Sequence, residues 1–234
     1  MATSGRDSGA THGRDSAATH GRDSGATDEL ERIVLASASP RRRQLLADVG
    51  LRFSVRPADV DEDLAAFAEP SDAALELACR KARAGAQRLG GAASGRWIVG
   101  ADTIVAVPDG ASWRLLGKPA DSAEANAMLE ALSRARHQVV TGVCVLRGAD
   151  SLEFAASERT WVTMRAIAPA ERSAYVASGE WRDKAGGYAI QENADRFVTA
   201  LEEGGFDNVV GLPVNLTLEL LRRAGALDRS RPLT

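Results

Sequence analysis

Arg41 and Arg42 occupy the first turn of an expected helix, a position that disfavours positive charge. The helix follows an apolar strand in LASASPRRRQLLADVG (35–50), with Ser39 placed to cap it and a proline directly after. On a helical wheel Arg42 falls in the middle of the apolar face and Arg41 at its edge. Since a helix N-terminus carries free N–H groups and about half a positive charge, the pattern indicates a bound oxyanion such as phosphate. The alternative is a structural ion pair with the acidic stretch 59–63.

Asp102 interrupts an otherwise apolar strand, WIVGADTIVAV (97–107). A continuous apolar strand of this kind is typical of a buried position in a sheet. Burying an unpaired carboxylate costs several kcal/mol, so Asp102 is expected to be paired, bound to a metal or functional. Its position beside Thr103 favours a functional site, and a structural pair with a lysine is the alternative.

Two lysines occupy unusual positions in the same part of the sequence. Lys81 lies almost centrally on the apolar stripe of an expected helix over 71–89, so its ammonium needs a partner or must snorkel past the edge of the helix. Lys118 lies in LLGKP, where it is either a cleft residue or part of a solvated turn. The segment is not a Walker A loop, because Gly110 lies too far from the Gly117–Lys118 pair and a proline replaces the required Ser or Thr.

The segment DKAGGYAIQ (183–191) combines opposite charges, a double glycine, an aromatic ring and an amide. The glycines allow a close approach of the backbone to a ligand, and Gln191 can read the edge of a nucleobase. By contrast, GLP (211–213) is adequately explained as the beginning of the last helix.

Composition narrows the chemistry of such a site. The chain has 234 residues, a net charge of −3 and three histidines, of which only His137 lies outside the N-terminal region. The charge argues against a nucleic-acid binder, and the scarcity of histidine argues against a histidine zinc site or a Ser-His-Asp triad. Carboxylates, lysines, arginines and a hard metal ion are the expected catalytic groups. Cys79 and Cys144 lie in apolar segments and are expected to be buried, reduced thiols of a cytoplasmic protein that does not enter a membrane.

The elements that must position these residues alternate along the chain. Strands are expected over 32–37, 51–55, 97–107, 113–116, 137–146, 154–165 and within 188–201, and helices over 40–49, 71–89, 122–133, 169–178 and 213–223. This order predicts a mixed α/β or α+β domain over 29–226. It is preceded by a polar octad repeat (GRDSGATH, GRDSAATH, GRDSGATD) that makes residues 1–28 a disordered tail, and it is followed by a short tail over 227–234.

Taken together, the motifs resemble one known family, the Maf-type nucleoside triphosphate pyrophosphatases. The resemblance covers about residues 32–224 and rests on SASPRRRQLL, DEDL, CRKARA, GADTIV, LGKP, VVTGV, DKAGGYAIQ and NVVGLPV in this order. It implies a fold related to the inosine triphosphate pyrophosphatases, with an elongated mixed sheet flanked by helices around a central cleft. It also implies hydrolysis of a nucleoside triphosphate to the monophosphate and pyrophosphate with a divalent metal, Mg²⁺ or Mn²⁺.

The resemblance also implies a role for each matching residue. Asp102 matches the family's catalytic proton acceptor, and with Glu62 it is expected to hold the metal. The other matching positions are expected to bind substrate, and they are Arg41, Arg42, Lys81, Thr103, Lys118 and Gln191. Thr103 and Gln191 resemble the subgroup that acts on dTTP and UTP. One departure is Glu192, which stands where members of the family commonly have glycine.

Two other functions stay open at this stage. The chain is either this enzyme or a nucleotide-binding regulator of septum formation whose turnover is incidental. A purine-directed or modified-nucleotide pyrophosphatase is a third reading. In each case the partner is a nucleoside triphosphate rather than a nucleic acid or a membrane, and a homodimer is left open.

Overall fold

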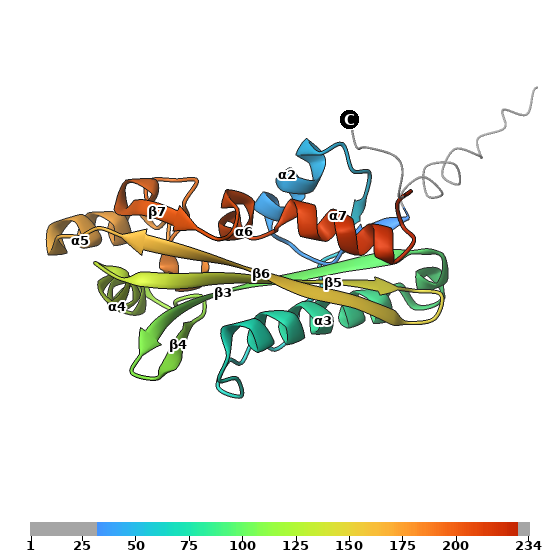
Figure 1. Ribbon diagram of the computed structural model, residues 1–234, viewed down its shortest axis with the longest axis horizontal. Coiled ribbons are helices and arrows are strands. Elements are labelled where there is room, and N and C mark those ends of the chain that lie inside the picture. The colour runs from blue at the N-terminus through green and yellow to red at the C-terminus, as the bar shows by residue number, and fades with distance from the viewer. Residues whose placement is uncertain (1–31, 229–234) are drawn as a thin grey trace, which may run out of the picture.

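The computed structural model describes residues 32–228 and builds them around one mixed sheet of seven strands (Figure 1). Helices flank this sheet, as expected for a mixed α/β domain. The octad repeat expected to form a disordered tail (1–28) and most of the expected C-terminal tail (227–234) lie outside the described residues.

Three long antiparallel strands form the centre of the sheet. The path of hydrogen-bonded neighbours is β2-β1-β3-β5-β6-β7, and β4 pairs with β3 beside this path. The strands are β1 (Ile33–Leu35), β2 (Ser54–Val55), β3 (Trp97–Asp109), β4 (Ser112–Leu116), β5 (Arg136–Arg147), β6 (Leu152–Met164) and β7 (Val198–Glu202). Only β1 makes parallel pairs, one with β2 and one with β3, so the sheet is mixed.

One edge of β3 has a gap in its pairing. Residues 97–99 pair with β1, and residues 105–109 pair with β4 on the same side. Between these two pairings, residues 100–104 have a strand partner only on the other side, where they meet β5. The sheet therefore opens at the middle of its longest strand, at Asp102 and Thr103.

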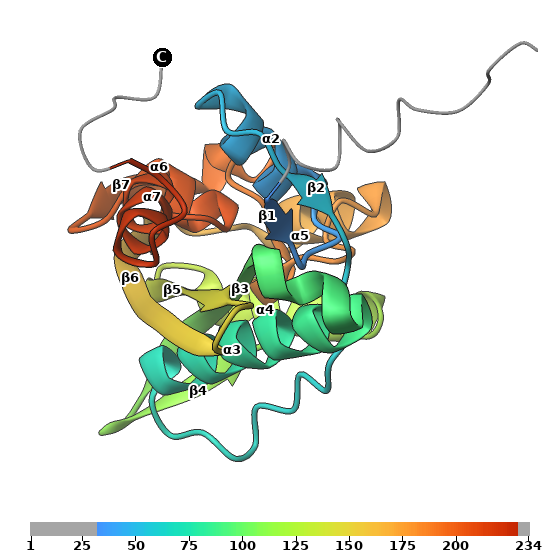
Figure 2. The ribbon, with the colours of Figure 1, turned by 90° about the vertical axis from the view of Figure 1, so that its right-hand side faces the viewer.

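Helices cover the two faces of the sheet differently (Figures 1 and 2). They are α2 (Pro40–Asp48), α3 (Pro70–Leu89), α4 (Ser122–Leu132), α5 (Pro169–Ser178), α6 (Phe206–Val210) and α7 (Val214–Arg223). The long helix α3 lies along one face, whereas α2, α6 and α7 lie on the other (Figures 1 and 2). Since side chains alternate between the faces of a strand, Asp102 points toward α3, and Thr103 points toward α2 and α6.

Glycines allow α3 to approach the sheet closely. A Cβ atom on Gly100 would lie 2.2 Å from the carbonyl oxygen of Ala78, and one on Gly142 would lie 2.2 Å from that of Ala74. Any side chain at either glycine would push the helix away. The contact of backbone on backbone fixes the distance between α3 and the two central strands, and with it the reach of Lys81.

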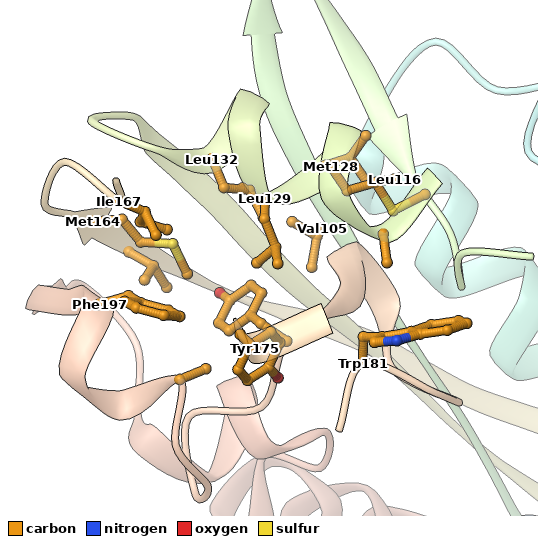
Figure 3. Close-up of a cluster of buried hydrophobic side chains, with 14 of the residues drawn as sticks. Val105, Leu116, Met128, Leu129, Leu132, Met164, Ile167, Tyr175, Trp181 and Phe197 are labelled. Atoms are coloured by element: carbon orange, nitrogen blue, oxygen red, sulfur yellow. The ribbon is translucent and has the colours of Figure 1, made fainter. Parts of the chain in front are cut away.

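An apolar cluster fills the end of the molecule that holds α4 and α5 (Figure 3). Tyr175 and Phe197 meet edge to face within it, with ring centroids 5.8 Å apart. Tyr188 and Ala185 belong to the same cluster. Packing of these two residues in the apolar cluster therefore fixes the position of the segment 183–191.

The expected elements differ from the structure mainly near the C-terminus. Short strands were expected within 188–201, but only β7 forms, preceded by the single turns η2 (Ala185–Gly187) and η3 (Asp195–Phe197). Residues 190–197 instead form consecutive turns that end in η3, so the chain becomes extended only from Val198. The five-residue helix α6 and the turn η1 (Gly90–Gly95) were not expected, because each is too short to carry a periodic pattern. None of the helices in residues 32–228 is both long and apolar enough to cross a membrane.

Candidate active site

A cavity of about 630 Å³ opens at the gap in β3 and contains every residue that the sequence singled out for the site. The eight residues are Arg41, Arg42, Glu62, Lys81, Asp102, Thr103, Lys118 and Gln191. They come from α2, α3, β3 and three loops that are far apart in the sequence. The volume lies within the range of small-molecule sites.

An alternating chain of charges forms the floor of the cavity. The buried Lys81 ammonium donates to Oδ1 of Asp102, and it also lies 2.7 Å from Oε1 of Glu62. The other carboxylate oxygen of Glu62 accepts a hydrogen bond from Lys118 at 2.7 Å. Lys81 therefore does not snorkel to solvent. Asp102 is paired with a lysine and also lines the cavity, so the two interpretations of this carboxylate do not exclude each other.

Glu62 reaches the floor from the loop between β2 and α3. Arg88 near the end of α3 holds the beginning of that loop, through the carbonyl oxygen of Pro57 and the carboxylate of Asp59. Burial would raise the pKa of Glu62, but the hydrogen bonds from Lys118 and Lys81 outweigh it and lower the pKa to about 2. Glu62 is thus a carboxylate, available to a cation, throughout the physiological pH range.

The buried guanidinium of Arg42 supports the wall of the cavity on the opposite face of the sheet. It donates to the carbonyl oxygen of Gly211 at 2.7 Å and to the hydroxyls of Ser37 and Thr103, each at 3.1 Å. Burial lowers its pKa, and the negative charge of Asp102 opposes that effect. The ion pair of this arginine with residues 59–63 was the alternative expectation, and it is wrong. Its partners are neutral, so the positive charge stays available to an anion.

Arg41 lies on the cavity wall one residue earlier in α2. It is half-buried and makes no ion pair within residues 32–228. Ser39 caps the helix as expected, accepting from the backbone N–H of Arg42 at 3.4 Å. The first turn of α2 thus presents an uncompensated cation to the cavity.

A network of polar residues that begins at Thr103, a partner of Arg42, was not predicted from the sequence. Thr103 contacts the Thr141 hydroxyl at 2.9 Å, and Thr141 donates to the carbonyl oxygen of Asn208 at 2.9 Å. The carbonyl oxygen of Gly211 accepts from Arg42, so the segment explained as a helix start also shapes the site. The motifs VVTGV and NVVGLPV contain these residues, but buried polar contacts between distant segments leave no periodic signal in one sequence.

The segment 183–191 forms the remaining wall. Gly186 has a φ of +66°, and a Cβ atom there would meet the Val105 side chain at 3.0 Å, so glycine is required for the close contact with β3. The Tyr188 hydroxyl contacts Nε2 of the buried His137 at 2.8 Å. These contacts anchor the segment and leave Gln191 exposed at the cavity rim.

Glu192 is paired with Lys184, a buried lysine of the cavity wall. Its carboxylate lies 3.0 Å from the Lys184 ammonium, and that ammonium also donates to the carbonyl oxygen of Glu180. Glu180 in turn accepts from the side-chain amide of Asn193 at 2.5 Å. Glu192 is not a lining residue of the cavity. Glu192, where the sequence departs from the family pattern, therefore closes the segment on itself through Lys184.

The charges of the cavity suit a ligand with several negative charges. Among all the residues that line the cavity, five are cationic and four are acidic, and two of the acidic ones, Asp59 and Asp183, are exposed to solvent, so the enclosed part of the wall has an excess of positive charge. The carboxylates of Glu62 and Asp102 share a single ammonium at the floor. This arrangement can bind a polyphosphate, hold a cation beside it and accept a proton from water.

Comparison with known proteins gives matches over the same region. A family model described as Maf-like protein matches residues 32–224. The chain is 46% identical over 196 residues to a dTTP/UTP pyrophosphatase of Anaeromyxobacter dehalogenans (strain 2CP-C), covering 83% of this chain and 94% of that protein. It is 46% identical over 200 residues to one from Geobacter sulfurreducens (85% and 100% covered) and 48% identical over 193 residues to one from Myxococcus xanthus (82% and 92% covered).

Proposed function

Because this chain belongs to the Maf-like protein family, we propose that it is a pyrophosphatase that hydrolyses nucleoside triphosphates, with dTTP and UTP preferred. The products are the nucleoside monophosphate and pyrophosphate. The observation that carries this proposal is the floor of the cavity, where one buried ammonium joins the carboxylates of Asp102 and Glu62 below a cationic wall.

The cationic wall binds the triphosphate. Arg41 has no carboxylate partner in the part of the chain that the structure describes, and the partners of Arg42 are neutral. Lys118 is half-exposed and is tied only to Glu62, so it can turn toward a phosphate. Charge-assisted hydrogen bonds from these groups fix the triphosphate with its α-phosphorus above the floor.

Asp102 acts on the water. Its carboxylate is held by Lys81 through Oδ1, which leaves the second oxygen to orient a water molecule and accept its proton. The water oxygen forms a bond to the α-phosphorus as the bond to the bridging oxygen of the β-phosphate breaks. Pyrophosphate leaves with the electron pair of that bond, and the lysines and arginines neutralise the charge that it takes away.

The carboxylates of Glu62 and Asp102 also suit a divalent metal. Both are hard oxygen donors, they already share one cation, and Glu62 is ionised down to about pH 2. We assign Mg²⁺ or Mn²⁺ to this pair of residues. When bound, such an ion adds positive charge beside the triphosphate and makes the phosphorus more open to attack.

Gln191 reads the base in this proposal. A side-chain amide donates one hydrogen bond and accepts another, which matches a carbonyl oxygen and the adjacent N3–H of thymine or uracil. Cytosine presents an amine and an unprotonated nitrogen instead, so CTP is disfavoured. Thr103 contributes indirectly, because its hydroxyl accepts from Arg42.

Pyrophosphate release across a panel of nucleotides tests the proposal. We expect the highest kcat/KM for dTTP and UTP with Mg²⁺ or Mn²⁺, and a lower value for CTP. A purine-directed enzyme would instead turn over ITP or 7-methyl-GTP faster. A regulator of septum formation would bind nucleotide with negligible turnover, and that result would overturn the proposal.

A further inference from the structure

Two thiols and a carboxylate converge between α3 and the sheet, away from the proposed active site. The ligand atoms of Cys79, Cys144 and Glu153 all lie within 4.8 Å of one another. Neither cysteine forms a disulfide, and these two are the only cysteines of the chain. No residue of this group lines the cavity that holds Asp102.

The fold brings the three residues together from separate elements. Cys79 lies on α3, Cys144 on β5 and Glu153 on β6, next to the close contact of the helix with Gly100 and Gly142. In the register of β5 and β6, Leu146 is opposite Glu153, and Cys144 is opposite Ala155, two residues further along β6. Cys144 and Glu153 therefore project from the same face of the sheet, toward α3.

The two thiols of this group are buried, whereas its carboxylate is partly exposed to solvent. Cys144 is fully buried and Cys79 is 8% exposed, whereas the Glu153 side chain is 26% exposed. Arg83 covers the solvent side and holds the Glu153 carboxylate with two hydrogen bonds of 2.6 and 2.8 Å. Glu153 is therefore the member of the group nearest to solvent, and a surface arginine holds it there.

We propose that Cys79, Cys144 and Glu153 form a second metal site, one that takes a thiophilic divalent cation of the Zn²⁺ or Cd²⁺ class. Two sulfurs and one carboxylate oxygen, with water as a fourth ligand, make up a tetrahedral set for such an ion. The ligand chemistry separates this site from the cleft, where both carboxylates offer only hard oxygen donors.

Charge balance supports binding at this depth. Without metal, the two thiols are neutral and Glu153 is balanced by Arg83. Binding a divalent ion releases the two thiol protons, and the ion, two thiolates, one carboxylate and Arg83 then carry no net charge. Because the buried region stays neutral in both states, the exchange avoids the cost of an uncompensated buried charge.

Cadmium titration of the full, reduced chain tests the site. After treatment with a phosphine reductant and a chelator, Cd²⁺ should produce the ultraviolet charge-transfer band of a thiolate–cadmium bond, saturating at one equivalent. Excess Zn²⁺ should abolish the band by competition. Because the ion ties α3 to two central strands, saturating Zn²⁺ should also raise Tm by roughly 5 °C or more.

Three variants separate this site from a bare thiol pair. Cys79→Ala, which changes the less buried cysteine, should lose the band and the zinc-dependent rise in Tm. Glu153→Gln should keep the band but bind Cd²⁺ at least about 10-fold more weakly. The matched control is Glu202→Gln, which breaks another exposed arginine pair, with Arg136, and should change neither result.

Three results would contradict the proposed metal site. Absence of the band in the reduced wild-type chain overturns the site. So does a band of full intensity in Cys79→Ala. If Glu153→Gln binds Cd²⁺ as tightly as the wild type, the carboxylate is no ligand and the three-residue site is wrong.

Discussion

Two buried lysines occupy different regions of this molecule, and their partners differ. Lys81 on α3 is 6% exposed and Lys184 in the 183–191 segment is 7% exposed. Lys81 joins two carboxylates, Asp102 and Glu62, that come from a central strand and a distant loop. Lys184 also lines the cavity, but it binds the Glu180 carbonyl oxygen and the Glu192 carboxylate, which are only four and eight residues away in the sequence.

Burial of a charge therefore does not by itself indicate a catalytic role. Local partners such as Glu180 and Glu192 close a segment on itself and need no ligand. Partners that converge from separate elements onto a cavity floor hold their charges where a substrate can reach them. Lys81 thus has the partners expected of the proposed active site, whereas Lys184, although it lines the same cavity, has the partners of a structural clasp.

Replacing each lysine by methionine tests this distinction with the largest expected effect. Lys81→Met removes the cation that holds Asp102, so kcat/KM for dTTP should fall by a factor of about 10² or more. Lys184→Met loosens only a local clasp, so kcat should stay within about 10-fold of the wild type. Steady-state kinetics of both purified variants measure the difference.

Stability provides the check on these two variants. Each leaves a carboxylate without its ammonium, so both should have a lower Tm than the wild type. Folding is verified by circular dichroism before the kinetics. An equal loss of activity in two folded variants would remove the distinction between the two lysines.

Unlike the two buried lysines, the buried His137 has no charged partner and is held neutral. Burial lowers the pKa of His137 from 6.5 to about 3. The unfolded chain therefore takes up a proton below pH 6.5 that the native state refuses, so stability is complete above pH 6.5 and is lost as the pH falls toward 3. Glu62, whose pKa falls from 4.5 to about 2, contributes stability that is lost only below pH 4.5.

The interval between these two ranges isolates His137. From pH 6.5 to 4.5 the wild type should lose roughly 2–3 kcal/mol of unfolding free energy through this residue. His137→Gln cannot take up the proton and should lose correspondingly less over the same interval. Urea unfolding at the two pH values measures both losses, and equal slopes for wild type and variant would contradict the burial argument.

The sequence predicted the charged floor better than the walls that support it. Lys81 and Asp102 each break an apolar pattern, and such a break is visible in one sequence because burying a charge needs a reason. Asn208 and Thr141 are uncharged, so they do not stand out in the sequence. Their partners are backbone carbonyls and hydroxyls of distant segments, which one sequence does not reveal. The long strands and helices were predicted from their periodicity. The helix α6 was missed because five residues are too few to show one.

The smallest predicted effect concerns the choice of base. Gln191→Ala removes the amide at the rim and should lower the preference for UTP over CTP several-fold, with little change in the rate on CTP. Glu192→Gln is the matched control, because that side chain does not line the cavity and is paired with Lys184, so the change should leave the preference unchanged. An altered preference in the control alone would show that Glu192 reads the base.

Asp102→Asn keeps the shape of the side chain of the proposed catalytic carboxylate and removes its charge. Metal-dependent pyrophosphate release from dTTP should fall by a factor of about 10² or more. Binding of a non-hydrolysable dTTP analogue, measured by calorimetry, should weaken by less than about 10-fold. The control is Asp109→Asn, an exposed position on the same strand, which should match the wild type. A folded Asp102→Asn variant that still releases pyrophosphate at the wild-type rate would contradict the account.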